Sequence, residues 1–297
     1  MSPAFNGVLI LNKPAGWTSH DVVAKVRGLL REKQIGHLGT LDPLATGVLP
    51  LAVGNATRLI EFASYPKEYV TTCLLGTTTD SCDVTGKVLS VKETMGLSVE
   101  KIRAATEKLR ELTEQVPPMV SALKKDGQKL YELARQGVEV ERKPRPIRIE
   151  AVEILDVSAP RVTFRVACSA GTYVRVLCQT LGEGLGVGGC MESLERGRVG
   201  PFLLSQAITL EEIKKRVEEG NLSGMLLPAS RLVDHLPQVQ VGPKLLEGLC
   251  QGQSIRVEEG HPGLYRVLNA HGRLSVVAEV VGGLLRPKKV FGMEGLD

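Results

Sequence analysis

The stretch GHLGTLDPLATGVLPLAVG, from Gly36 to Gly54, joins a glycine-rich loop to an apolar strand. Its one carboxylate, Asp42, precedes Pro43, whose ring favours extended backbone at the preceding residue and removes the next amide donor. The glycines at 39 and 47 let the backbone approach another group closely. The loop therefore restricts Asp42, either as a turn residue that accepts backbone hydrogen bonds or as a group that meets a ligand.

His37 and Asp42 in one loop raise two further alternatives, a metal site and a hydrolytic dyad. A metal needs a third ligand, and the remaining histidines stand in no ligand-like spacing to His37. The chain has no G-x-S-x-G nucleophile elbow. The D-S-C-D segment, Asp80 to Asp83, lacks the glycine and closing glutamate of a calcium loop and is interpreted as a turn. We therefore do not expect metal catalysis.

Length, composition and net charge limit the class of protein. With 297 residues, 43% of them hydrophobic, the chain is long enough for one larger and one smaller domain. A net charge of +4 mildly favours a polyanionic partner. The six cysteines contain no C-x-x-C pair, which fits reduced thiols in a cytoplasm. The short N-terminal apolar run predicts neither a signal peptide nor a membrane span, so we expect a cytoplasmic protein.

Apolar periodicity predicts the secondary structure. Cap candidates Thr18 and Ser19 open a helix, and Thr209 with Glu212 forms a capping-box pattern that opens another. From about Val239 a short helix and four strand-like pieces predict a small β-rich domain. We expect strands at 7–13, 67–76, 86–91, 147–155 and 162–168, and helices at 19–31, 55–63, 98–112 and 170–186.

Several blocks of the chain carry a resemblance to a known family. They are GVLILNKPAGWTSHDVV, GHLGTLDPLATGVLPLAVGNATR, KEYVTTCLLGTTTDSCDVTG, QVPPMVSALKKDGQKLYELARQG, CSAGTYVRVL and LLRPKKVF. In order and spacing they resemble the TruB family of tRNA pseudouridine synthases over nearly the whole chain. An ordered, full-length match is far more specific than one loop.

The resemblance implies an α+β protein with the pseudouridine synthase fold, a central mixed, mainly antiparallel sheet flanked by helices. It places the catalytic domain at 1–236, with a basic RNA-clamp insert at about 115–148, and a small PUA-like RNA-binding domain at 237–297. The implied activity is isomerisation of uridine 55 in the T arm of tRNA to pseudouridine. The implied enzyme is a cofactor-free monomer whose partner is the tRNA T stem-loop.

The resemblance also implies roles for individual residues. Asp42 is the catalytic aspartate, acting either as a nucleophile or by abstracting a ribose proton, and Arg175 is the cation that keeps it ionised. Tyr69 stacks on the flipped uracil and handles a proton, while Leu194 closes the pocket. His37 resembles the histidine that pushes in beside the flipped nucleotide and stabilises the unstacked RNA loop. The remaining substrate-binding candidates are Gly39, Thr40, Lys67 and Tyr173, and the RNA-binding candidates are Lys124, Lys129, Arg145, Arg286, Lys288 and Lys289.

Five positions depart from the family pattern: Leu38, Val120, Ala170, Cys190 and Glu195. The missing lysine at Ala170 and the acidic residue at Glu195 both reduce attraction for phosphate. None of these departures replaces Asp42, Tyr69 or Arg175.

Two other functions stay open from the sequence. One is an RNA-guided synthase of the dyskerin type, although this chain lacks long basic tails and keeps the clamp insert. The other is a non-catalytic chaperone that folds tRNA by binding its T arm. Replacing Asp42 by asparagine distinguishes the enzyme from the chaperone. In the enzyme it should abolish pseudouridine formation and leave tRNA binding nearly intact, whereas a chaperone does not need the carboxylate.

Overall fold

The computed structural model describes residues 5–121, 123–125, 127–257 and 261–296, apart from the side chains of residues 124, 125, 129, 131 and 135. Its central sheet has the strand order β1-β3-β13-β4-β12-β11, with β2 beside β3 and β14 beside β13. The strands are β1 (Gly7–Lys13), β2 (Ile35–His37), β3 (Thr46–Val53), β4 (Lys67–Leu75), β11 (Ile149–Ser158), β12 (Arg161–Cys168), β13 (Gly189–Val199) and β14 (Phe202–Leu203).

The pairing within this sheet is antiparallel except where β13 runs parallel to β3. The prediction of a mixed, mainly antiparallel sheet is therefore confirmed. Strand β4 reads KEYVTTCLL, and its alternate residues from Tyr69 to Leu75 are buried. This period of two places one face of the strand on the core.

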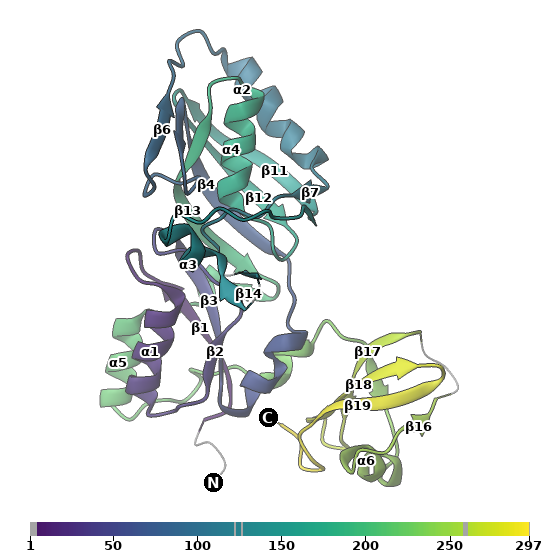
Figure 1. Cartoon of the computed structure of the whole chain (residues 1–297). Helices are drawn as coiled ribbons and strands as arrows, with labels where there is room; N and C mark the ends of the chain where they lie inside the picture. Colours follow the sequence, from purple (N-terminus) through teal and green to yellow (C-terminus); the bar gives the residue numbers. More distant parts are fainter. Residues whose placement is uncertain (1–4, 122, 126, 258–260, 297) are drawn as a thin grey trace.

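Helices cover the sheet in two groups (Figure 1). Helices α1 (Ser19–Leu30) and α5 (Leu210–Glu218) share an apolar core with β1 and β3. Helices α2 (Val99–Glu107) and α4 (Val174–Gly184), with the 3₁₀ turn η2 (Lys108–Glu111), pack on β4, β12 and β13. Further 3₁₀ segments are η1 (Gly54–Phe62), η3 (Leu204–Gln206) and η4 (Ala229–Val233).

The predicted helix caps are present, and two predicted helix boundaries were wrong. Thr18 forms a capping box with Asp21, and Thr209 forms one with Glu212. The helix expected over 98–112 ends as an α-helix at Glu107 and continues as η2. The helix expected from position 170 begins at Val174, because the preceding Gly171 has a positive φ of 88° that a right-handed helix excludes.

In the described residues, three pairs of short strands lie outside the two larger sheets. Strands β5 (Thr77–Thr79) and β6 (Val88–Val91) form one of them. Within the predicted insert, β7 (Glu114–Gln115) pairs with β10 (Arg145–Pro146), so the two ends of this segment lie together. Between them, β8 (Lys124–Lys125) pairs with β9 (Gln128–Lys129), and α3 (Leu130–Arg135) follows.

The C-terminal residues form a second sheet, with strand order β15-β17-β18-β19-β16. Helix α6 (Pro243–Cys250) packs on it, and Figure 1 shows this unit beside the lower part of the central sheet. The sheet contains the four predicted strand pieces and one strand that the sequence did not indicate, β15 (Gln238–Gln240). The other four strands are β16 (Ile255–Arg256), β17 (Gly263–Leu268), β18 (Leu274–Val281) and β19 (Leu284–Val290).

In the described part of the chain, no helix combines the length and apolar character needed to cross a bilayer.

Candidate active site

The loop between β2 and β3 carries Asp42 and is held by hydrogen bonds on both sides of that residue. The Ser19 hydroxyl accepts from the Leu41 amide at 2.9 Å and lies 3.1 Å from the Leu41 carbonyl oxygen. The Gly16 amide donates to the Pro43 carbonyl at 2.8 Å. Helix α1 and the end of β1 thus fix the backbone that positions the carboxylate.

Lys13 supports the same loop from the end of β1. Its side chain is fully buried, and its Nζ donates to the carbonyls of Pro14 at 2.8 Å and Trp17 at 2.7 Å. A third, longer bond reaches the Pro43 carbonyl at 3.4 Å. Burial lowers the pKa of Lys13 to about 8, and the nearby charge of Asp42 works against this shift. Lys13 therefore stays mostly charged at neutral pH beneath the Asp42 loop.

The Asp42 carboxylate forms a two-pronged ion pair with Arg175. The Arg175 Nε lies 2.9 Å from Oδ2, and Nη2 lies 3.5 Å from Oδ1. The arginine side chain is 3% exposed and the aspartate side chain 35%. A guanidinium matches a carboxylate in this geometry. The site thus presents an accessible carboxylate paired with a buried arginine.

Arg175 also joins the loop to two other segments. Its Nη1 donates to the Ser81 carbonyl at 2.8 Å, and its Nη2 donates to the Val120 carbonyl at 2.8 Å. A second carboxylate, Asp83, lies 3.7 Å from Nη1. Arg175 therefore ties Asp42 to the D-S-C-D turn and to the insert.

Asp83 is itself held inside the D-S-C-D turn. Its Oδ1 accepts from the Ser81 hydroxyl at 2.9 Å, the Thr85 amide at 3.0 Å and the Thr85 hydroxyl at 2.5 Å. The segment is a turn, as predicted, but it also supplies a buried partner for Arg175.

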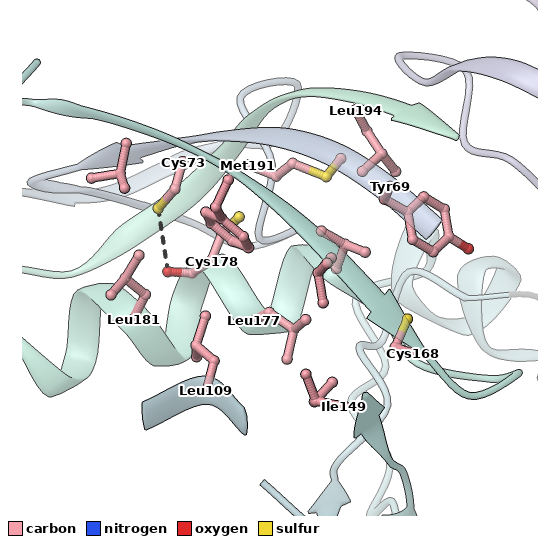
Figure 2. Packing of buried hydrophobic residues seen from close by; sticks show 14 of the residues in the cluster. Tyr69, Cys73, Leu109, Ile149, Cys168, Leu177, Cys178, Leu181, Met191 and Leu194 are labelled. Atoms are coloured by element: carbon pink, nitrogen blue, oxygen red, sulfur yellow. Dashed lines mark hydrogen bonds between the residues drawn. The ribbon is translucent and has the colours of Figure 1, made fainter. Parts of the chain in front are cut away.

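Tyr69 and Leu194 lie near one another on adjacent strands β4 and β13 (Figure 2). Tyr69 is 7% exposed and Leu194 is 8% exposed, and both belong to one apolar cluster. Burial raises the pKa of the Tyr69 phenol, while the charge of Arg196 and a hydrogen bond with it act in the opposite direction. The phenol is therefore protonated at neutral pH.

The other predicted substrate residues lie in or next to the loop between β2 and β3. Gly39 has a φ of 102°, and a Cβ at this position would lie 3.2 Å from Lys67 Cε. Burial, followed by the charge of Arg196, lowers the pKa of Lys67 to about 8. Burial also lowers the pKa of His37 below its ordinary value, so its ring is neutral at pH 7. Thr40 is exposed at the surface of the loop.

Tyr173 lies at the start of α4, directly before Val174, and is anchored by the insert. The Gln115 side chain accepts from the Tyr173 amide at 2.8 Å and donates to the Tyr173 carbonyl at 3.1 Å. Burial raises the pKa of the Tyr173 phenol. The base of the insert and the helix that carries Arg175 are thus joined through backbone atoms.

The predicted RNA-binding residues lie in different environments. Arg145 and Arg286 are exposed, on β10 and β19. Lys288 lies 3.1 Å from Glu279, and Lys289 lies 2.6 Å from Glu61, so both lysines have carboxylate partners within the chain. Lys124 and Lys129 pair through their backbones in β8 and β9, and their side chains lie outside the described part.

The five departures from the family pattern also fall in different places. Leu38 and Cys190 are buried in the core. Val120 contributes its carbonyl to Arg175, and its side chain is exposed. Glu195 is exposed and Ala170 is half-buried.

Within the described ranges, no group of three or more histidine, cysteine, aspartate or glutamate side chains is arranged to hold a metal ion.

Comparison with known proteins identifies the family. The model described as "TruB family pseudouridylate synthase (N terminal domain)" matches residues 27–174, and "tRNA pseudouridylate synthase B C-terminal domain" matches 175–234. This chain belongs to the TruB family. A relative from Dehalococcoides mccartyi, named tRNA pseudouridine synthase B, is 41% identical, covering 96% of each chain. A relative of the same name from Thiobacillus denitrificans is 43% identical, covering 97% of this chain and 96% of its own.

Solved structures support the TruB-family fold. The Cbf5 chain of a Cbf5–Nop10–Gar1 complex superposes with a TM-score of 0.75 and 27% identity, covering 97% of this chain and 86% of its own. A chain of an H/ACA ribonucleoprotein bound to a substrate RNA gives a TM-score of 0.73 and 26% identity, covering 96% and 84%.

In this TruB-family chain, four residues that support the site were not found from the sequence. Lys13 ends an apolar strand, where a buried lysine is unusual, and this was a usable signal. Asp83 was interpreted only as a turn residue. Gln115 and Arg196 act through backbone contacts with distant segments, for which the sequence carries no local pattern.

Proposed function

We propose that this chain is a tRNA pseudouridine synthase that isomerises uridine 55 in the T arm to pseudouridine. It acts as a cytoplasmic monomer on the T stem-loop, without a cofactor or metal. The names of the curated relatives, at about 40% identity over nearly the full length, support the reaction and the class of substrate.

The observation that carries the proposal is the ion pair between Asp42 and Arg175. A nucleophile or base must be ionised to react, and a dry pocket opposes ionisation unless a cation lies close. The 2.9 Å contact from Arg175 Nε provides that cation while 35% of the Asp42 side chain stays exposed to a substrate.

The reaction is an isomerisation that needs no other reactant. The bond between ribose C1′ and N1 of uracil breaks, the base turns, and a bond forms between C1′ and C5. The C5 proton then leaves and N1 gains a proton, so atoms and charge balance. Asp42 serves this sequence in one of two ways, as a nucleophile or as the base that removes a ribose proton.

The glycosidic bond is inaccessible while the uridine is stacked, so the nucleotide must turn out of the T loop, at a cost of a few kcal/mol. Stacking on an aromatic ring returns about 1–3 kcal/mol per base. Tyr69 offers the ring and Leu194 the apolar wall. Neutral His37 pushes in beside the flipped nucleotide and stabilises the unstacked RNA loop. Gly39 and Thr40 give the RNA backbone room to approach.

The remaining contacts follow the RNA away from the flipped base. Lys67 and Tyr173 border the loop and contact the substrate. The insert at 115–148 closes over the T stem-loop through Lys124, Lys129 and Arg145. The PUA-like residues 237–297 meet phosphates through Arg286, Lys288 and Lys289.

The second candidate is a synthase that depends on a guide RNA. The structural similarity to chains of Cbf5 and H/ACA complexes supports this candidate. Incubating purified protein with a tRNA transcript and no other RNA distinguishes the two. Formation of pseudouridine at position 55 supports the stand-alone enzyme, whereas a strict need for a second RNA supports the guided one.

The decisive experiment compares Asp42→Asn with the wild type on the same transcript, with position-specific mapping of pseudouridine. We expect the variant to form none while its affinity for tRNA changes less than about threefold, since one exposed carboxylate contributes little to RNA binding. Asp156→Asn, at an exposed strand position, is the matched control and should stay active. An active Asp42→Asn protein contradicts the proposal, and an inactive wild type that binds tRNA points to a chaperone.

A further inference from the structure

Arg196 is a buried cation next to the proposed site, with no role assigned so far. It lies on β13 directly opposite Tyr69 on β4, so the two side chains leave the sheet on the same face. Its side chain is fully buried. Among the described residues, no carboxylate lies within ion-pair distance of it. A buried charge without a counter-ion is costly, which calls for an explanation beyond packing.

Its guanidinium is satisfied by backbone carbonyls of the Asp42 loop and of β3. Nε donates to the Val48 carbonyl at 2.8 Å. Nη2 donates to the Gly39 carbonyl at 3.1 Å, and Nη1 reaches the Thr40 carbonyl at 3.4 Å. Ser19 and Lys13 hold the other parts of this loop, so Arg196 supplies the hold on the residues that lead into Asp42.

The contact with Tyr69 has a direction. Arg196 and Tyr69 face each other across the two strands, and a guanidinium can only donate hydrogen bonds, so in any contact between them the tyrosine oxygen is the acceptor. The phenol proton is then free to be donated elsewhere. Because burial keeps the phenol protonated at neutral pH, Tyr69 is a hydrogen-bond donor.

We infer that Arg196 is a positioning residue for the isomerisation, which fixes the Gly39–Thr40 backbone leading to Asp42 and orients the Tyr69 hydroxyl as a donor to the bound nucleoside. This inference rests on the proposed function. A lysine cannot replace it, because an ammonium lacks the planar fork that spans three separate carbonyls.

The test measures single-turnover pseudouridine formation at saturating tRNA transcript in wild type, Arg196→Lys and Arg196→Gln. We expect both variants to react about 100-fold more slowly, the size of loss that follows a small misplacement of catalytic groups. RNA affinity should change by less than about twofold, because no phosphate contact is removed. The control is Arg198→Lys, a half-buried arginine on the same strand, which should react at the wild-type rate.

Two readouts separate positioning from general destabilisation. In a double-mutant cycle, Tyr69→Phe should cost much less in the Arg196→Lys background than in the wild type, since the orientation of the hydroxyl is already lost. Amide exchange at residues 39–42, in the loop between β2 and β3, should be about tenfold faster in Arg196→Gln. Exchange in β13 should be unchanged.

The outcomes are distinct. Additive effects of Tyr69→Phe and Arg196→Lys, or a wild-type rate in Arg196→Lys, overturn the inference and leave the proposed function standing. A wild type that forms no pseudouridine refutes the proposed function instead. Unchanged amide exchange at residues 39–42 in Arg196→Gln refutes the anchoring of the loop, whatever the activity.

Discussion

At the scale of single residues, the proposed site depends on how buried charges are satisfied. Arg175 uses its donors on Asp42, on two carbonyls and near Asp83. Arg196 and Lys13 use theirs on carbonyls of the Asp42 loop and its neighbours. Each of these cations therefore holds backbone atoms, and Arg175 also holds the Asp42 carboxylate. Such preorganised groups are what an active site needs.

Replacing Arg175 by methionine tests this arrangement. We expect a loss of about 3 kcal/mol in the free energy of unfolding, because removing one member of a buried pair leaves the other charge uncompensated. Adding Asp83→Asn should recover part of the stability but no activity, because Asp42 still lacks its cation. Urea unfolding and pseudouridine formation measure the two effects. Arg165→Met, which removes only exposed ion pairs, is the control and should cost under about 1 kcal/mol.

Lys67 gives a pH-dependent prediction. Its pKa is about 8 in the folded protein and near 10.4 in an unfolded chain. Between these values the unfolded chain binds more protons, so the wild type gains stability relative to Lys67→Met as pH rises from about 8 to 10. Urea unfolding at several pH values measures this difference. The exposed helix substitution Lys214→Met should give a constant difference, and the same result for Lys67→Met would contradict the shift.

At the scale of elements, α4 brings Arg175 to the loop because it packs closely on β13. Gly182 on α4 makes this approach possible, since a Cβ there would collide with the backbone of Gly188 and Gly189. The other end of the helix is fixed by Gln115 through the backbone of Tyr173. The position of Arg175 thus depends on contacts at both ends of one helix.

We expect Gly182→Ala to destabilise the protein by about 1–3 kcal/mol, the usual cost of overpacking a close contact. Activity should fall as well, since α4 moves away from the loop. Gly184→Ala is the matched control on the same helix, because a Cβ there meets nothing within 4 Å. It should be neutral or slightly stabilising in thermal unfolding. Equal melting temperatures for the two variants would contradict this account of the packing.

At the scale of the whole molecule, the C-terminal sheet shares a core with the central sheet. Leu274 and Val277 of β18 belong to the same buried cluster as Val8 and Val48 of the central sheet. Arg58 lies over the ring of Phe291, 4.9 Å from its centre. These contacts hold the C-terminal sheet against the central sheet and η1.

The ion pairs of that sheet predict unequal roles in RNA binding. Arg286 is exposed, whereas Lys288 already pairs with Glu279. If Arg286 meets a phosphate, Arg286→Ala should reduce the slope of log affinity against log salt by about 0.7–0.9. Lys288→Ala should change the slope less. Titration of tRNA from 50 to 300 mM salt, a range of about sixfold, measures both. Equal changes would show that the intramolecular pair opens on binding.

Local sequence patterns predicted most of the helices and strands, and the ordered blocks predicted the family. The caps at Thr18 and Thr209, the alternation along β4 and the glycines and proline around Asp42 are local signals, and each has its physical effect within a few residues of chain. The ordered blocks gave the family, and with it Asp42, Tyr69 and Arg175 as candidates.

The contacts between these site residues depend on the tertiary structure. Arg175 contacts Asp42 across 133 residues of sequence, and Arg196 reaches Gly39 across 157. Gln115 and Arg196 could not be placed from the sequence because their partners are backbone atoms of distant segments. The role of Asp83 was missed because Arg175 reaches it from a distant helix. These long-range contacts form when β13 pairs between β3 and β4. That pairing joins segments far apart in the sequence, so local propensity does not predict it.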